Sequence, residues 1–171
     1  RIRLRKVETM YFKQKSVAIR NLDHMLETLN TLDHEFNYSV AWIDALAKGN
    51  KLGSGVISFG NSAKLNDLPD KLKNDPLKIH SKGKLSVPIF LPSFTLNNLT
   101  VRILNRAIAF VQNSPKQFVH YEKFFFPLDA INNWNRGYGK RGFIQYQFVI
   151  PEENGRQHLV EILEMIAASG C

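Results

Sequence analysis

The chain has 171 residues, of which 44% are hydrophobic, and its formal net charge is +8 at pH 7. This length can bury one hydrophobic core, so we expect a single domain over residues 1–171. The sequence contains no long apolar run and no charged segment followed by an apolar core, which excludes a membrane span and a signal peptide within these residues. The single cysteine, Cys171, excludes an internal disulfide.

The positive charge favours anionic partners, which include nucleic acid, anionic lipid headgroups and phosphorylated substrates. No helix-turn-helix spacing, zinc-ligand set or aromatic RNA-binding signature favours nucleic acid among these. An equally open alternative is that an acidic part of a longer chain balances the charge, because net charge affects association rather than fold.

The first predicted elements are strands and a helix. Strand-like stretches cover residues 7–12 and 16–19, and the basic residues among them indicate a sheet edge or an exposed face. Asn21 is a suitable N-cap for the helix that follows, in which apolar residues repeat at intervals of three and four. This helix is predicted to run to about residue 32 or 34 and to cover one side of a sheet.

Residues 37–45 and 52–59 are predicted to form two antiparallel strands joined by a turn that contains glycine. The first of these strands alternates, and Trp42 lies on its aromatic side. Gly53 and Gly55 are not followed by a GK[ST] sequence or a strand-to-helix junction, so we expect no phosphate-binding loop there.

Prolines interrupt residues 61–92, and long irregular segments of this kind are usually functional loops or disorder. A helix is predicted over residues 94–111, a strand over 117–123 and a final helix over 156–169. The helix over 94–111 either covers the core or touches a membrane surface with its basic and apolar residues. The elements together predict an α+β fold, an antiparallel or mixed β-sheet with helices packed on one face.

The most distinctive stretch is residues 123–151, which read KFFFPLDAINNWNRGYGKRGFIQYQFVIP. We interpret it as an apolar strand, a proline stop, a short helical turn with Trp134, a glycine-rich turn and a second apolar strand. Alternation places Gln145 and Gln147 on one face of that second strand, beside apolar neighbours. An unpaired buried amide costs ~1–3 kcal/mol, so these amides face water, meet polar protein groups or point into a cavity that receives a polar ligand.

This stretch, together with YSVAWIDALAKGNKLGSGVISFGN at 38–61 and LPDKLKNDPLKI at 68–79, resembles the substrate-binding (cap) domain of flavin-dependent sugar oxidoreductases. These enzymes belong to the vanillyl-alcohol-oxidase-like group. The resemblance implies that the chain is a cap domain of α+β type and a piece of a larger flavoenzyme, whose FAD-binding domain lies outside residues 1–171. It also implies that loops near 80–98 and 128–141 gate the mouth of the active site.

The resemblance implies hydride transfer from a carbinol carbon of a sugar or sugar alcohol to FAD, a cofactor that the other domain would bind. Members of the family oxidise polyprenyl-phosphate ribose, acting as one component of a 2-epimerase with a short-chain reductase partner in cell-wall polysaccharide synthesis. Other members oxidise aldonolactones, and both substrate classes stay open. The substrate-binding positions that carry over to this sequence are Trp42, Phe125, Leu128, Ile131, Gln145 and Gln147.

Two of these positions keep an alternative. Trp42 is equally well explained by plain core packing, since large aromatic side chains dominate cores as well as cavities. The sugar oxidase has a Tyr-His pair where this chain has Phe125 and Phe126, which removes two polar contacts and leaves room for a less polar substrate.

The chain shows no complete catalytic constellation. None of its five histidines has the spacing of a metal pair, and no nucleophile lies in a recognisable turn. We therefore expect no catalytic, cofactor-binding or metal-binding residue here, and no activity from this chain alone. The expected partners are the sugar substrate, the FAD domain of the same chain and a membrane surface, with the protein in the cytoplasm or at a membrane. A basic module for nucleic acid or anionic lipid is the alternative outside the enzyme class, and it rests on charge alone.

Overall fold

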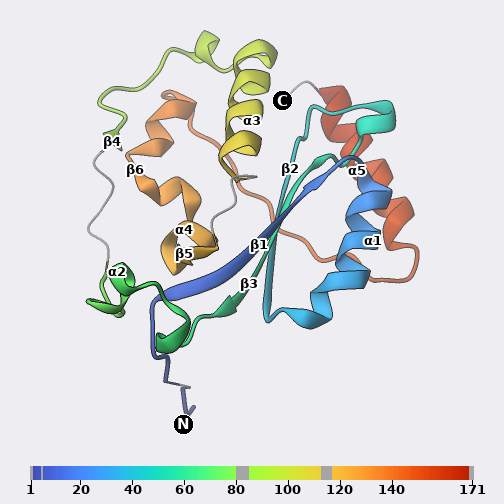
Figure 1. The fold of residues 1–171 in the computed structure, drawn as a ribbon. Coiled ribbons are helices and arrows are strands. Elements are labelled where there is room, and N and C mark those ends of the chain that lie inside the picture. Colours follow the sequence, from blue (N-terminus) through green and yellow to red (C-terminus); the bar gives the residue numbers. More distant parts are fainter. Residues whose placement is uncertain (1, 5, 80–84, 113–116, 170–171) are drawn as a thin grey trace.

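The computed structural model describes residues 2–4, 6–79, 85–112 and 117–169, and Figure 1 shows its fold. A four-stranded antiparallel sheet of order β2-β3-β1-β5 lies at its centre, with helices packed around it. The strands are β1 (Tyr11–Ile19), β2 (Tyr38–Ile43), β3 (Gly55–Ser62) and β5 (Phe118–His120). The predicted α+β class and the predicted antiparallel pairing of β2 with β3 are therefore confirmed.

The register of the sheet sorts its side chains onto two faces, because paired residues of antiparallel strands point to the same side and successive residues to opposite sides. One side, called here the aromatic face, carries Phe12, Gln14, Ser16, Ala18, Tyr38, Val40, Trp42, Val56, Ser58 and Gly60. The opposite side, called the helix face, carries Val17, Ile19, Ile43, Ile57 and Phe59.

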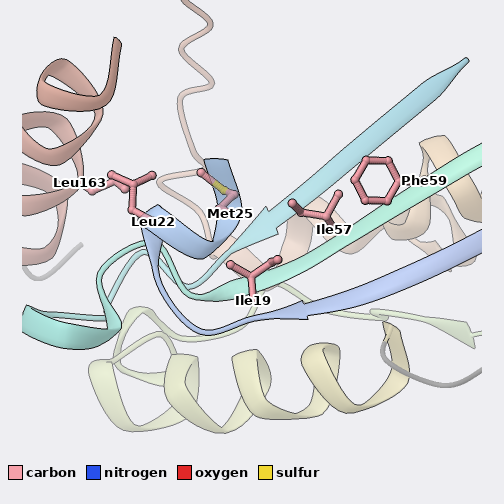
Figure 2. Close-up of a cluster of buried hydrophobic side chains, with 6 residues drawn as sticks. All are labelled: Ile19, Leu22, Met25, Ile57, Phe59 and Leu163. Atoms are coloured by element: carbon pink, nitrogen blue, oxygen red, sulfur yellow. The ribbon is translucent and has the colours of Figure 1, made fainter. Parts of the chain in front are cut away.

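The helix face is buried under α1 (Leu22–Leu32) and α5 (Gly155–Ser169). In Figure 2, side chains of both helices meet those of β1 and β3 in one apolar cluster. Ile57 and Phe59 are completely buried there, and such burial contributes about 1.5–3 kcal/mol for each side chain. The main core of the molecule therefore lies on this side of the sheet.

A local sequence signal explains the start of α1, and a long-range ion pair joins α1 to α5. The side-chain oxygen of Asn21 accepts a hydrogen bond from the backbone N–H of His24 at 2.9 Å, so the predicted N-cap of α1 is confirmed. The guanidinium of Arg156, at the start of α5, donates to the carboxylate of Asp23 at 2.7 and 3.3 Å. The first turns of α1 and α5 are thereby tied together, and the predicted helix over 156–169 is confirmed.

On the aromatic face, α4 (Tyr121–Phe125) packs against the strands, and α3 (Asn98–Gln112) lies beside β3. Helices therefore cover parts of both faces, where the sequence predicted cover on one. The strand predicted over 117–123 ends at His120, whose imidazole accepts a hydrogen bond from the backbone N–H of Glu122 at 3.4 Å and caps α4. The apolar run that begins at Lys123 was predicted to be a strand, and it is helical instead because its aromatic rings pack down onto the sheet.

A second, separate sheet consists of two short parallel strands, β4 (Leu85–Ser86) and β6 (Ile131–Asn132). Apart from α2 (Asp70–Lys73), the remaining helical pieces are short 3-10 turns. They span Asp33–Glu35, Gly49–Lys51, Leu65–Asp67, Ser93–Thr95, Pro127–Ala130 and Trp134–Tyr138. The helical turn predicted around Trp134 is therefore present.

Residues 143–150 were predicted to form a second apolar strand, and this prediction is wrong for the present structure. The segment is exposed, with 95% of Ile144 and 83% of Tyr146 accessible to solvent. An extended segment becomes a strand only where a neighbouring edge exchanges backbone hydrogen bonds with it. Within the described part of the chain, no strand pairs with this segment.

Candidate functional site

Trp42 lies on β2, is partly buried and belongs to the aromatic face. Its partner in β3 is Val56, which is buried, and Val40 and Tyr38 precede it on the same side of the strand. A partly accessible indole on a sheet surface can pack against protein on one side and meet a ligand on the other. Trp42 is therefore a wall residue of the aromatic face.

Phe125 reaches the same face from α4. Its ring lies 5.3 Å from the ring of Tyr38 and 5.4 Å from that of Phe12, edge to face in both cases. Phe124, beside it, is buried and stacks on Phe12 with the ring centroids 5.3 Å apart. Edge-to-face and stacked pairs of this kind contribute roughly 0.5–1.5 kcal/mol each beyond burial of their area. These rings form a rigid aromatic wall at the Tyr38 end of β2. Trp42 lies about 13 Å from Tyr38 along the same strand.

Leu128 and Ile131 follow Phe125 on the chain and are both exposed, by 47% and 37% respectively. Leu128 lies in the 3-10 turn Pro127–Ala130, and Ile131 pairs with Leu85 in the parallel β4–β6 sheet. The β4–β6 pairing thus joins the segment around Ile131 to the loop before α3. The side chains of Leu128 and Ile131 stay accessible to solvent.

The two predicted gating loops, 80–98 and 128–141, are bonded to each other where they are described; residues 80–84 lie outside the described residues. The backbone N–H of Val87 donates to the carbonyl of Asn132 at 3.0 Å, and that of Leu91 donates to the carbonyl of Arg136 at 3.0 Å. These bonds extend the β4–β6 pair. The two loops therefore form one unit, and their gating motion stays a prediction.

The side chain of Arg136 strengthens this unit. Its guanidinium donates to the carbonyl of Pro88 at 2.7 Å and to that of Val87 at 3.4 Å, and it lies 5.8 Å from the ring centre of Phe90. Gly139 adopts a positive φ of 70°, and a Cβ there would lie 2.8 Å from the carbonyl oxygen of Leu91. The arginine and the last glycine of the WNRGYG sequence thus hold the neighbouring loop, a role that sequence reasoning missed.

Gln145 and Gln147 lie in the exposed segment described above and are themselves exposed. The structure does not bring them to the aromatic face, so their predicted role in substrate binding stays a prediction. Their amides face water, which was one of the alternatives that the alternation left open.

The structure does bring a different set of polar groups to the aromatic face. Gln14 and Ser16 of β1 and Ser58 of β3 are all partly buried and bonded to one another. Sequence reasoning did not single them out, because Gln14 lies in the polar run Lys13–Ser16, between the two predicted strand stretches. The available signal was the spacing of two residues between Gln14 and Ser16, which puts both on one face of a continuous strand.

The hydrogen bond from Arg156 lowers the pKa of Asp23 below its ordinary value, and the charge of Arg156 adds to this effect. Over the described residues, no group of three or more acidic, cysteine or histidine side chains could hold a metal ion. In that same part of the chain, no helix is both long and apolar enough to cross a membrane.

Comparison with known proteins finds a strong similarity over most of the chain. No protein-family model matches the chain. The chain is 36% identical over 154 residues to the decaprenylphosphoryl-β-D-ribose oxidase of Mycolicibacterium smegmatis. The match covers 89% of this chain and 34% of the relative, so the chain spans about a third of the length of the curated relative that it matches. The resemblance indicated by the sequence is thereby confirmed: along most of its length, the chain is similar to part of a decaprenylphosphoryl-β-D-ribose oxidase.

Proposed function

We propose that this chain is the substrate-binding domain of a longer, FAD-dependent oxidoreductase that oxidises a carbinol carbon of a sugar. The observation that carries the proposal is the 36% identity to an oxidase over 89% of the chain. The aromatic face supports it physically, because binding sites for organic ligands are lined mainly by aromatic and apolar side chains with a few placed polar groups. Trp42, Phe125 and the cluster around Gln14 fit that description.

Gly53 and Gly55 do not fit the pyrophosphate of FAD. A pyrophosphate needs backbone donors, usually from a glycine-bearing loop that opens a helix. Gly55 opens β3, where a Cβ would collide with the backbone carbonyl of Trp42, so this glycine serves the close approach of two strands. Gly53 has a φ of 75° and its Cβ would lie 2.8 Å from the Cβ of Leu22, so it packs against α1. We therefore propose that FAD binds to another part of the longer protein.

Each predicted site residue would then act on the substrate. FAD, when bound, supplies the acceptor for the hydride. Trp42 and Phe125 would exclude water and press on the apolar side of the sugar, and Leu128 and Ile131 would extend this surface toward a lipid or other apolar group. Gln145 and Gln147 would orient sugar hydroxyls once their segment is brought to the site.

The proposed substrate is a polyprenyl-phosphate ribose, by analogy with the decaprenylphosphoryl-β-D-ribose after which the relative is named. Aldonolactones are the second candidate, because Phe125 and Phe126 lack the hydrogen-bonding groups of a Tyr-His pair and so leave room for a substrate other than the polyprenyl-phosphate sugar. A site built to hydrogen-bond a hydroxyl discriminates strongly against an analogue without it, so the two substrate classes can be separated by kinetics.

The test uses the longer protein that contains this chain. We expect bleaching of its flavin absorbance when a short-chain prenylphosphoryl-β-D-ribose is added without oxygen. Trp42→Ala should lower kcat/KM by at least about 10-fold, which corresponds to about 1.4 kcal/mol, since tryptophan is a frequent hot-spot residue whose truncation costs about 2 kcal/mol or more. Tyr146→Ser serves as the control and should stay close to wild type, because Tyr146 is 83% exposed and sequence alternation puts it on the other side from Gln145 and Gln147.

If aldonolactones bleach the flavin and the prenylphosphoryl ribose does not, the proposed substrate becomes an aldonolactone. A purified, folded protein that contains no flavin and oxidises neither substrate would contradict the proposed function.

A further inference from the structure

The Gln14 cluster consists of the side chains of Gln14, Ser16 and Ser58. The Nε2 of Gln14 donates to the Oγ of Ser16 at 2.6 Å and to the Oγ of Ser58 at 3.2 Å. The two serine hydroxyls lie 3.2 Å apart, and one of them donates to the other. Ser16 and Ser58 are direct partners across β1 and β3, and Gln14 pairs with Gly60 in the next row of the same face. The cluster is therefore built into the centre of the aromatic face.

These internal bonds leave part of the hydrogen-bonding capacity unused. Both N–H groups of the Gln14 amide are engaged by the serines, while in the described residues its Oε1 has no partner. Of the two serine hydroxyls, only one hydrogen is needed for the bond between them, so the other can donate outward. The cluster thus presents one fixed acceptor and one donor side by side, which is the complement of two neighbouring hydroxyl groups.

The surroundings of the cluster suit a sugar. Gln14 shares its row with Tyr38 through Gly60, and Ser58 is diagonal to Trp42 on the neighbouring strand, a relation that corresponds to about 7–8 Å. The three polar side chains are partly buried and so keep some accessible surface beside α4, which packs on Val40 in the row of Ser16 and Ser58. Ala18, further along β1 on the same face, is exposed. Beyond the short pairing with β5 at Tyr11–Lys13, β1 has no described neighbour on its second edge.

We propose that the Gln14 cluster is a binding subsite for two neighbouring hydroxyls of a furanose or a similar polyol, between the aromatic side chains of Tyr38 and Trp42. This inference rests on the proposed function, because the FAD domain and the other wall of the site lie outside this chain. The cluster acts as a positioning and specificity element: it fixes the sugar ring and takes no part in the hydride transfer.

The test measures KM and kcat of the longer protein with short-chain prenylphosphoryl-β-D-ribose and with its 3-deoxy and 5-deoxy analogues. Gln14→Met keeps approximate side-chain volume and removes the amide, and Ser58→Ala removes one hydroxyl. Each variant should raise KM for the complete substrate about 2- to 12-fold, the range expected for one neutral hydrogen bond, with kcat little changed. For at least one of the two deoxy analogues, each variant should have the same KM as wild type, because that analogue lacks the hydroxyl that the removed side-chain group would bind.

Ser39→Ala is the matched control, because Ser39 is exposed on β2 and lies on the opposite face. Melting temperatures of all variants separate binding from folding. The subsite would be overturned if the Gln14 and Ser58 variants had a lower melting temperature but the same KM as wild type. It would also be overturned if these variants discriminated against both deoxy analogues as strongly as wild type does. If the wild type turns over and Trp42→Ala is impaired while the Gln14 and Ser58 variants match wild type, the subsite fails and the proposed function stands. If the wild type is inactive with sugar and lactone alike, the proposed function itself fails, and the subsite fails with it.

Discussion

The ring of Phe124 lies over Gly60 so closely that a Cβ at position 60 would be 2.8 Å from both the Cε2 and the Cζ atoms of the ring. The ring cannot retreat freely, because it is stacked on Phe12 with an interplanar angle of 10°. The contact between these two residues fixes α4 on the aromatic face, and so it determines where Phe125 lies.

Gly60→Ala should therefore destabilise the protein by about 1–3 kcal/mol, the usual cost of overpacking. Gly137→Ala is the control, since a Cβ at Gly137 would meet nothing within 4 Å, and its effect should stay within about 0.5 kcal/mol. Urea unfolding of the two variants measures both effects. Equal midpoints for Gly60→Ala and wild type would show that Phe124 is not held over the glycine.

Arg136→Met should loosen the unit formed by residues 85–91 and 131–139. The substitution keeps an apolar side chain of similar length but removes the donors to the carbonyls of Val87 and Pro88. Loss of about 1 kcal/mol of local stability would speed amide exchange at Leu91 and Val87 about five-fold, while global stability changes little. Hydrogen exchange followed by mass spectrometry measures this, with Arg141→Met at an exposed position as the control. Unchanged exchange over 85–91 would mean that the backbone bonds alone join the loops.

Gln147→Leu tests the predicted role of the amides in the longer protein. If the amide of Gln147 binds a sugar hydroxyl, kcat/KM should fall by an amount equivalent to about 1–3 kcal/mol. The melting temperature should hardly change, because Gln147 is exposed in this chain. Gln157→Leu, an exposed amide on α5, is the control. Normal kinetics together with a lower melting temperature would make Gln147 a structural residue.

The 171-residue chain by itself should bind no FAD, because the proposed function assigns that cofactor to another domain and because Gly53 and Gly55 serve close contacts with α1 and β2. Quenching of flavin fluorescence during a titration measures binding, and the longer protein provides the positive control. Saturable binding at low micromolar concentration would contradict the placement of FAD on another domain.

The ion pair between Asp23 and Arg156 should make stability depend on pH at the acidic end. Because Arg156 lowers the pKa of Asp23 in the folded state, its contribution is complete above the unfolded pKa of about 3.9 and is lost as the pH falls through the lower, folded value. Asp23→Asn should therefore lower the urea midpoint at pH 7 and at pH 5, and the difference from wild type should shrink at pH 3. A difference of the same size at all three values would assign it to packing at the start of α1 instead.

Short-range signals in the sequence determined the elements that lie close together on the chain. Asn21 and the apolar repeat after it were sufficient for α1, because a helix cap and an amphipathic stripe are both local features. The β2–β3 pair followed from alternation on both sides of a turn, and α5 from its repeat of apolar residues. The sequence also carried the resemblance to a sugar oxidase, since the matching stretches are long and distinctive.

The tertiary structure alone decided the features that depend on distant partners. The aromatic run after His120 became α4 because its rings find Phe12 and Gly60, more than a hundred residues and about sixty residues away respectively. Residues 143–150 have the alternation of a strand and no described edge to pair with, so they stay outside the sheet. Gln14 and Ser58 meet only through the register of β1 with β3. Propensity is set by neighbours in the chain, whereas strand pairing and side-chain clusters need partners that only the folded chain supplies.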